Sequence, residues 1–83
     1  MIPKIIQAVY NGDFRIRIKF EDGAEGVVDF KNELYGVVFE PLKDDEYFKS
    51  FQIRGSSLCW ENGADFAPEF LYESVKSPVS VKA

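Results

Sequence analysis

The sequence predicts an α+β fold of two layers, in which a curved antiparallel sheet carries two short helices in the order β-β-β-α-β-β-α. Apolar and cationic residues alternate without interruption from Phe14 to Phe20, which is typical of a half-buried strand. Turn sequences flank that strand, and Pro68 opens a segment with helical spacing of apolar residues. We place a single domain at residues 1–76 and a tail or edge strand at residues 77–83.

The first three strands are expected to form a meander. Residues 5–10 are apolar, and Asn11-Gly12 is a strong hairpin signal before the alternating strand. The loop Glu21-Asp22-Gly23 then fixes the register of the second hairpin, because a slip by one residue would place apolar side chains against charged ones. The expected pairs are Phe14 with Phe30, Ile16 with Val28, Phe20 with Ala24, Arg15 with Asp29 and Lys19 with Glu25.

The second half of the chain gives shorter signals. Residues 32–42 are irregular, and Asp44 or Asp45 can cap a short helix that turns Tyr47, Phe48 and Phe51 inward. Two short strands are expected at residues 51–54 and 58–61, and a last helix from Pro68 to about Val75. Such a short helix must dock on the sheet to be stable. We find no internal repeat or linker.

The composition restricts the chemistry. A net charge of −4 disfavours nucleic acid and anionic membranes as partners, because phosphate binding relies on cationic residues. The chain has no histidine and 1 cysteine, which excludes an internal disulfide, histidine-based catalysis and the usual zinc sites. Neither a signal peptide nor a membrane-spanning run is visible, so we expect a cytoplasmic protein.

One candidate surface is the cationic stripe formed by Arg15, Arg17 and Lys19 on one face of the alternating strand. It could bind an anion or nucleic acid. It could equally be a solvated face, because the predicted register supplies Asp29 and Glu25 as counter-charges. We favour the solvated face.

A second candidate is the segment from Trp60 to Asp65. Trp60, Asn62 and Asp65 could line a recess for a peptide or small ligand. Each residue also has a structural explanation: Asn62-Gly63 would turn the chain with positive backbone dihedrals, Asp65 would cap the last helix, and Trp60 would pack beneath it. We favour the structural explanation.

Other reactive groups suggest no chemistry. Cys59 lacks a histidine to activate it and is expected to be a half-buried strand residue. Residues 44–46 are acidic without the spacing of a calcium loop, and nothing positions a substrate beside Asp65 and Glu69. We therefore predict no catalytic, cofactor-binding or metal-binding residue, and lean against an enzyme.

Several short motifs resemble one bacterial family. These are Phe20-Glu21-Asp22-Gly23, Val28-Asp29-Phe30, Trp60-Glu61-Asn62-Gly63-Ala64-Asp65, Pro68-Glu69 and Leu71-Tyr72. Together they resemble the family called domain of unknown function 2442 (DUF2442), over nearly the whole chain from Ile5 to Tyr72. Glu61 departs from the proline that is usual in the family. The resemblance implies a small α+β fold without an assigned biochemistry.

Some relatives in that family carry a helix-turn-helix after this domain, and others stand alone beside a small partner protein. This chain ends too soon for a helix-turn-helix, so we expect a non-catalytic protein-interaction or regulatory module. It would act as an antitoxin-like protein or as an accessory of a transcription regulator. Its partner would be another protein or a second copy of the chain. The alternatives are a ligand-binding or enzymatic domain that uses the Trp60–Asp65 recess, and weak nucleic-acid binding through the cationic stripe.

Overall fold

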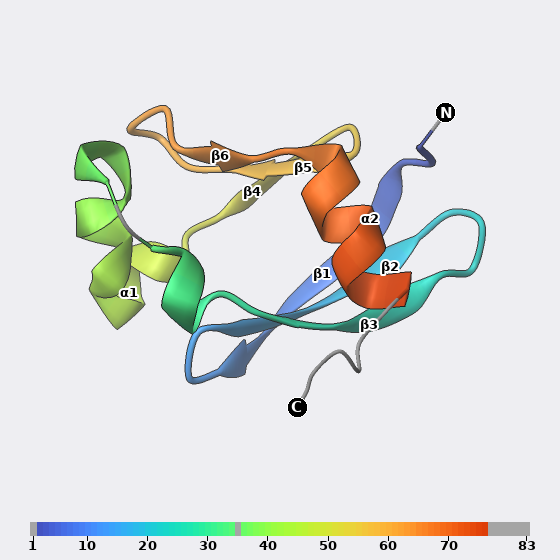
Figure 1. The fold of residues 1–83 in the computed structure, drawn as a ribbon, viewed down its shortest axis with the longest axis horizontal. Helices are drawn as coiled ribbons and strands as arrows, with labels where there is room; N and C mark the ends of the chain where they lie inside the picture. The colour runs from blue at the N-terminus through green and yellow to red at the C-terminus, as the bar shows by residue number, and fades with distance from the viewer. Residues whose placement is uncertain (1, 35, 77–83) are drawn as a thin grey trace.

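The computed structural model describes residues 2–34 and 36–76, and its strands form two antiparallel sheets (Figure 1). The first sheet contains β1 (Ile5–Gly12), β2 (Arg15–Phe20) and β3 (Glu25–Asp29), and the second contains β4 (Gln52–Arg54), β5 (Ser57–Cys59) and β6 (Asp65–Phe66). The helical elements are the 3₁₀ segments η1 (Lys31–Glu33) and η2 (Val37–Lys43) and the helices α1 (Asp45–Phe48) and α2 (Pro68–Lys76). The predicted α+β class is confirmed. The expected tail at residues 77–83 lies outside the described residues.

The register of the second hairpin is confirmed. Arg15 lies opposite Asp29 and Lys19 lies opposite Glu25. At the two ends of the ladder, the Phe20 N–H donates to the carbonyl of Ala24 at 2.8 Å, and the Phe30 N–H donates to the carbonyl of Phe14 at 2.8 Å. Alternation of apolar and charged residues excludes a slip by one residue, and the short loop at Gly23 sets the rest of this pairing.

The first hairpin turns later than predicted. Asn11 and Gly12 belong to β1, and the turn falls on Asp13 and Phe14, whose φ angles are 58° and 62°. A register shift between Tyr10 and Gly12 accommodates the extra length. The aromatic ring of Phe14 packs edge-on against Phe48 at a centroid distance of 5.1 Å, which explains why a bulky residue occupies this left-handed position.

The strands divide into two sheets where the sequence predicted one. Residues 31–48 are mostly helical, so the chain leaves the first sheet and returns as β4 in a second one. Strand β6 was not predicted, because a strand of 2 residues carries no periodicity. Figure 1 shows α2 between the two sheets, where it packs against β3 and β5.

The same hairpin loop occurs in both sheets. In the first, the Gly23 N–H donates to the Phe20 carbonyl at 3.0 Å and the φ angle of Gly23 is 96°. In the second, the Gly63 N–H donates to the Trp60 carbonyl at 3.0 Å and the φ angle of Gly63 is 94°. The similar sequences Phe-Glu-Asp-Gly-Ala and Trp-Glu-Asn-Gly-Ala thus adopt the same turn.

Both predicted helices are confirmed. The side chain of Asp44 caps α1 by accepting a hydrogen bond from the Glu46 N–H, and Phe48 is buried beneath it. Helix α2 begins at Pro68 and buries Leu71 and Val75. Side chains from both sheets and from both helices form one hydrophobic cluster, which the helices close on the side between the sheets.

Candidate functional site

The three residues of the cationic stripe lie on the exposed face of the first sheet. Arg15 forms ion pairs with Asp13 at 3.4 Å and with Asp29 at 3.9 Å. Arg17 forms a diagonal ion pair with Glu25 at 3.1 Å, and Glu25 is also the residue directly opposite Lys19. Arg15 and Arg17 thus form ion pairs and Lys19 lies opposite Glu25, so the face carries mixed charge instead of a basic groove.

Trp60 lies in the core and not on a surface. Its side chain is 3% exposed, and its Nε1 donates a hydrogen bond of 2.9 Å to the main-chain carbonyl of Phe48. Its ring also packs against Phe48, Phe51 and Phe66. The indole ring is thus buried among aromatic side chains and its only donor is bonded, although its ring contacts involve Phe48, Phe51 and Phe66 and not the last helix, beneath which we expected it to pack.

Asn62 connects its loop to two distant segments. Its Nδ2 donates to the carbonyl of Val38 at 2.9 Å, and its N–H donates to the hydroxyl of Tyr47 at 3.2 Å. Its φ angle is not positive, and Gly63 alone supplies the left-handed conformation of this loop. The side chain that we considered for ligand binding is therefore already engaged by the protein.

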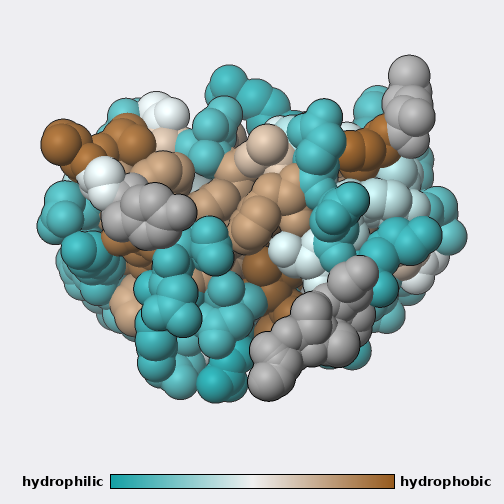
Figure 2. All heavy atoms as spheres, in the orientation of Figure 1, coloured by the Kyte–Doolittle hydropathy of each residue, from teal (hydrophilic) through white to brown (hydrophobic). Residues whose placement is uncertain are grey.

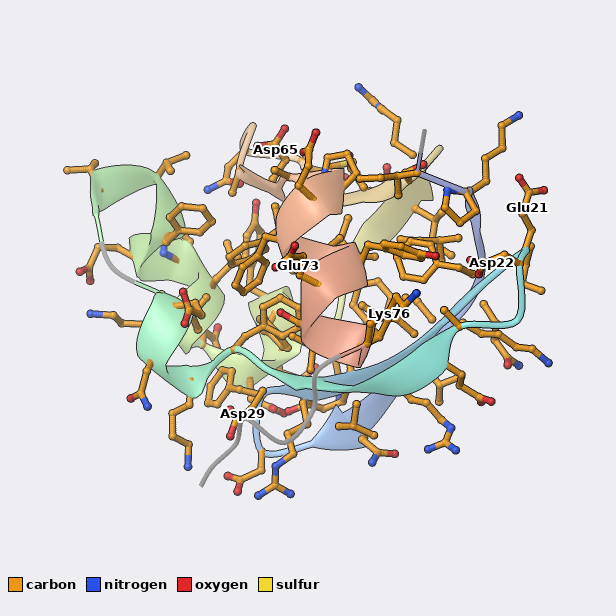
Figure 3. All side chains as sticks on the ribbon, turned by 45° about the vertical axis from the view of Figure 1, so that its right-hand side comes forward. Glu21, Asp22, Asp29, Asp65, Glu73 and Lys76 are labelled. Carbon is orange, nitrogen blue, oxygen red and sulfur yellow. The ribbon has the colours of Figure 1, made fainter. Side chains whose placement is uncertain are left out.

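Asp65 does not cap the last helix. It lies in β6 opposite Cys59, and Leu71 N–H bonds to the carbonyl of Ala67, which places Ala67 at the start of α2. Figure 3 shows Asp65 on the second sheet with its side chain directed to solvent. Trp60, Asn62 and Asp65 therefore point in different directions and do not converge on one recess.

An open recess of about 570 Å³ lies where the N-terminal segment meets both sheets. Its lining residues are Ile2, Pro3, Lys4, Glu21, Asp22, Gly55, Ser56 and Tyr72. The Ser56 hydroxyl donates to the carbonyl of Pro3 at 2.9 Å, and the Tyr72 hydroxyl donates to the carboxylate of Asp22. The polar side chains of the recess thus serve to join segments of the fold.

The hydrogen bond between Tyr72 and Asp22 shifts the pKa of both side chains. It is the main cause that lowers the pKa of Asp22 and raises the pKa of Tyr72. In Figure 3, Lys76 lies on the side of α2 that faces Asp22, and its positive charge lowers the pKa of Asp22 further. Both shifts favour the existing charge states at neutral pH, so neither group is prepared for proton transfer near pH 7.

The feature that stands out is the free edge of β1. This strand has 8 residues and no charged side chain, although it forms one edge of the first sheet. Its Ile6 and Val9 side chains are 57% and 45% exposed. Edge strands are normally protected by charges, prolines or short length, because unpaired main-chain groups recruit other strands.

The opposite edge of the same sheet is protected. Strand β3 begins with Glu25 and ends with Asp29, both exposed. Helix α2 also packs against β3, so closely that a side chain added at Gly26 would lie 3.0 Å from the carbonyl oxygen of Val75. The sheet therefore has one guarded edge and, in β1, an uncharged edge that the second sheet covers at Ile5, where the N–H bonds to Gly55, and that is free beyond this residue.

The main-chain groups of β1 alternate between β2 and the free side. Phe20 in β2 and Phe14 in the turn before it direct their main-chain bonds to the β3 side, so Arg17 directs its own to β1. Val9 lies opposite Arg17 and faces β2 in turn. It follows that Ala8 and Tyr10 present their N–H and C=O groups to the free side of β1.

An exposed residue of the second sheet lies beside this edge. Strands β1 and β4 come close together, and the Ile5 N–H donates to the carbonyl of Gly55 at 3.0 Å. Ile53 of β4 is paired with the buried Leu58, yet it is 43% exposed. Because paired residues share a face of the sheet, Ile53 lies on the same face as the buried Leu58, on a strand that forms an edge of the second sheet.

Sequence reasoning did not identify Ile6, Val9 and Ile53 as surface residues. The available signal was the absence of charge from Ile5 to Gly12 beside a strand in which every second residue is charged. That signal also fits a central strand, so it becomes informative only when the sheet order is known. A separate pair of exposed apolar residues, Val37 and Val38, lies on η2 and appears as a brown area in Figure 2.

Within residues 2–34 and 36–76, no group of three or more metal-ligating side chains comes together. In the same ranges, no helix has the length and apolar character needed to cross a membrane. Cys59 is half-buried in β5, as expected.

Comparison with known proteins gives one match. The model of the family described as "Protein of unknown function (DUF2442)" matches residues 5–77. No curated protein and no solved structure matches significantly. The matched range contains both hairpin loops and both helices.

Proposed function

The chain belongs to the DUF2442 family of proteins of unknown function, and from this premise we propose that it is a non-catalytic protein-interaction module that uses the free edge of β1. The supporting observation is an edge strand of 8 residues that lacks charge and exposes Ile6 and Val9. Such an edge is suited to strand addition, in which an extended segment of another chain continues the sheet.

Strand addition divides affinity and specificity between two sets of groups. The outward main-chain groups of Ala8 and Tyr10 would supply hydrogen bonds that any extended segment can form. The exposed side chains of Ile6, Val9 and Ile53 would favour an incoming strand that carries apolar side chains. The bound strand would convert three exposed apolar side chains into buried ones.

A module of this kind would regulate its partner protein by binding to it, without a catalytic step. We include in the proposal the two regulatory roles that the family resemblance suggests, an antitoxin-like protein and an accessory of a transcription regulator. Both require protein contact and no catalytic group, and both place the protein in the cytoplasm. The Trp60–Asp65 recess and the cationic stripe are weaker alternatives, because Trp60 is buried and Arg15 and Arg17 are paired with acids.

The test compares three forms of the full chain, each purified from its native host with a tag. We expect the unmodified chain to carry a stoichiometric protein partner, of its own or another sequence. Val9→Lys should lose that partner, because the charge enters the free edge. Val27→Lys is the matched control: Val27 lies in the same cross-strand row, opposite Arg17, but on the guarded edge. An unmodified chain that binds no protein at all contradicts the proposal.

A further inference from the structure

We infer that the free edge of β1 pairs antiparallel with β1 of a second copy of this chain, across a twofold axis beside Val9. This inference rests on the proposed function and identifies the partner. A twofold contact uses the same surface on both copies, so each residue close to the axis faces itself. The contact strand must therefore be compatible with its own sequence.

Charge singles out β1 for self-pairing. The described residues contain four edge strands, and three of them carry charged residues: Glu25 and Asp29 in β3, Arg54 in β4 and Asp65 in β6. Antiparallel self-pairing of a charged strand brings like charges close together. Strand β1 has no charge to repel its copy, although the whole chain carries a net charge of −4.

The main-chain directions of β1 fit an axis at Val9. Ala8 and Tyr10 both present their N–H and C=O groups to the free side, so Ala8 of each copy can form a hydrogen-bonded pair with Tyr10 of the other. Val9 then meets the second copy's Val9 in a non-hydrogen-bonded pair, where side chains are closest.

The charged face of the sheet does not oppose this arrangement. Arg17 lies on β2, one strand away from the contact, so the two copies of Arg17 would be separated by three strand spacings. With about 4.8 Å for each spacing, that separation is roughly 14 Å. It exceeds the screening length of about 8 Å at physiological salt, so repulsion between the two arginines is small.

The experiment measures the mass of the full chain in solution by sedimentation equilibrium over a range of concentrations. We expect the unmodified chain to be a dimer, and Val9→Lys and Val9→Glu each to be monomeric, because each places two like charges at the axis. An equal mixture of the two variants should form a dimer again, since a lysine then meets a glutamate. Recovery in the mixture cannot arise from a merely destabilised fold. Val27→Lys should stay dimeric.

Amide hydrogen exchange gives a second measurement that needs no substitution. The amides of Ala8 and Tyr10 should become protected as the concentration rises through the dimerisation range. A monomeric unmodified chain, a mixture that stays monomeric, or amides without concentration-dependent protection would overturn the inference. If the unmodified chain is monomeric but still loses a different protein on Val9→Lys, the proposed function stands and only the second copy is excluded as its partner.

Discussion

Asp22 and Asn62 occupy the same position in two hairpin loops of the same form, and each extends a second polar atom to a different part of the chain. The Oδ1 atom of each side chain accepts a hydrogen bond from the main-chain N–H two residues further on, at 2.9 Å for Asp22 and 3.1 Å for Asn62. The other oxygen of Asp22 accepts the hydroxyl of Tyr72, whereas the Nδ2 of Asn62 donates to the carbonyl of Val38. The second polar atom of Asp22 therefore accepts a hydrogen bond, whereas the second polar atom of Asn62 donates one.

This difference predicts that the two residues are not interchangeable. Asn62→Asp should lower the free energy of unfolding by about 1 kcal/mol, because a carboxylate cannot donate to the Val38 carbonyl and repels it. Asp22→Asn is the matched control and should cost less, since the Tyr72 hydroxyl can accept a hydrogen bond as well as donate one. Urea denaturation of both variants measures the difference. Equal losses would show that the second polar atom of Asn62 is unimportant.

The bond between Tyr72 and Asp22 predicts a dependence of stability on pH at both extremes. The lowered pKa of Asp22 gives stability that is present above the ordinary aspartate pKa of about 3.9 and is lost as the pH falls through the lowered value. The raised pKa of Tyr72 gives stability that is present below about pH 10 and is lost as the pH rises through the raised value.

Tyr72→Phe should therefore flatten both the acid and the alkaline limbs of a plot of melting temperature against pH. Tyr10→Phe is a control that should change only the alkaline limb. A hydrogen bond to Asp45 raises the pKa of Tyr10, so this variant should weaken the alkaline loss and leave the Asp22 contribution in acid unchanged. An unchanged acid limb in Tyr72→Phe would contradict the assignment to Asp22.

Local signals predicted the central hairpin and both helices. Strict alternation from Phe14 to Phe20 and the short loop at Gly23 allow one register, and Asp44 and Pro68 mark helix starts through their own backbone chemistry. These features depend on residues that are neighbours in sequence or directly paired. They do not require knowledge of which strand lies at an edge.

The candidate site depended on long-range relations that the sequence does not display. Val9 shares the solvent face of the first sheet with its partner Arg17, and Ile53 lies on an edge strand of a separate second sheet. Asn62 looked available for ligand binding because its hydrogen bond to Val38 joins two segments far apart in the chain, and such a contact cannot be foreseen from the sequence. Asp65 resembled a helix cap because nothing in its sequence reveals a strand as short as β6.

The contact between Gly26 and Val75 predicts a cost for the smallest possible side chain at the guarded edge. A Cβ at position 26 would lie 3.0 Å from the carbonyl oxygen and 3.2 Å from the Cα of Val75. Gly26→Ala should therefore displace α2 and lower the free energy of unfolding by about 1–3 kcal/mol. Thermal and urea denaturation measure this loss.

Val75→Ala supplies the control for that prediction. The closest atoms of Val75 are main-chain atoms, so shortening its side chain should not relieve the clash. Val75→Ala should therefore not restore stability to Gly26→Ala, and the loss in the double variant should approach the sum of the two single losses. A double variant much more stable than this sum would locate the conflict in the valine side chain.

The buried hydrogen bond from Trp60 to Phe48 can be tested without changing the packing around it. Replacing Trp60 with 3-benzothienylalanine retains the bicyclic shape but substitutes sulfur for the Nε1–H donor. The Phe48 carbonyl, now at 2.9 Å from that donor, would be left unpaired in the core, which should cost about 1–3 kcal/mol of unfolding free energy. Trp60→Phe should cost more, because it also removes buried ring volume. If the benzothienyl variant is as stable as the unmodified protein, the role of Trp60 is packing alone.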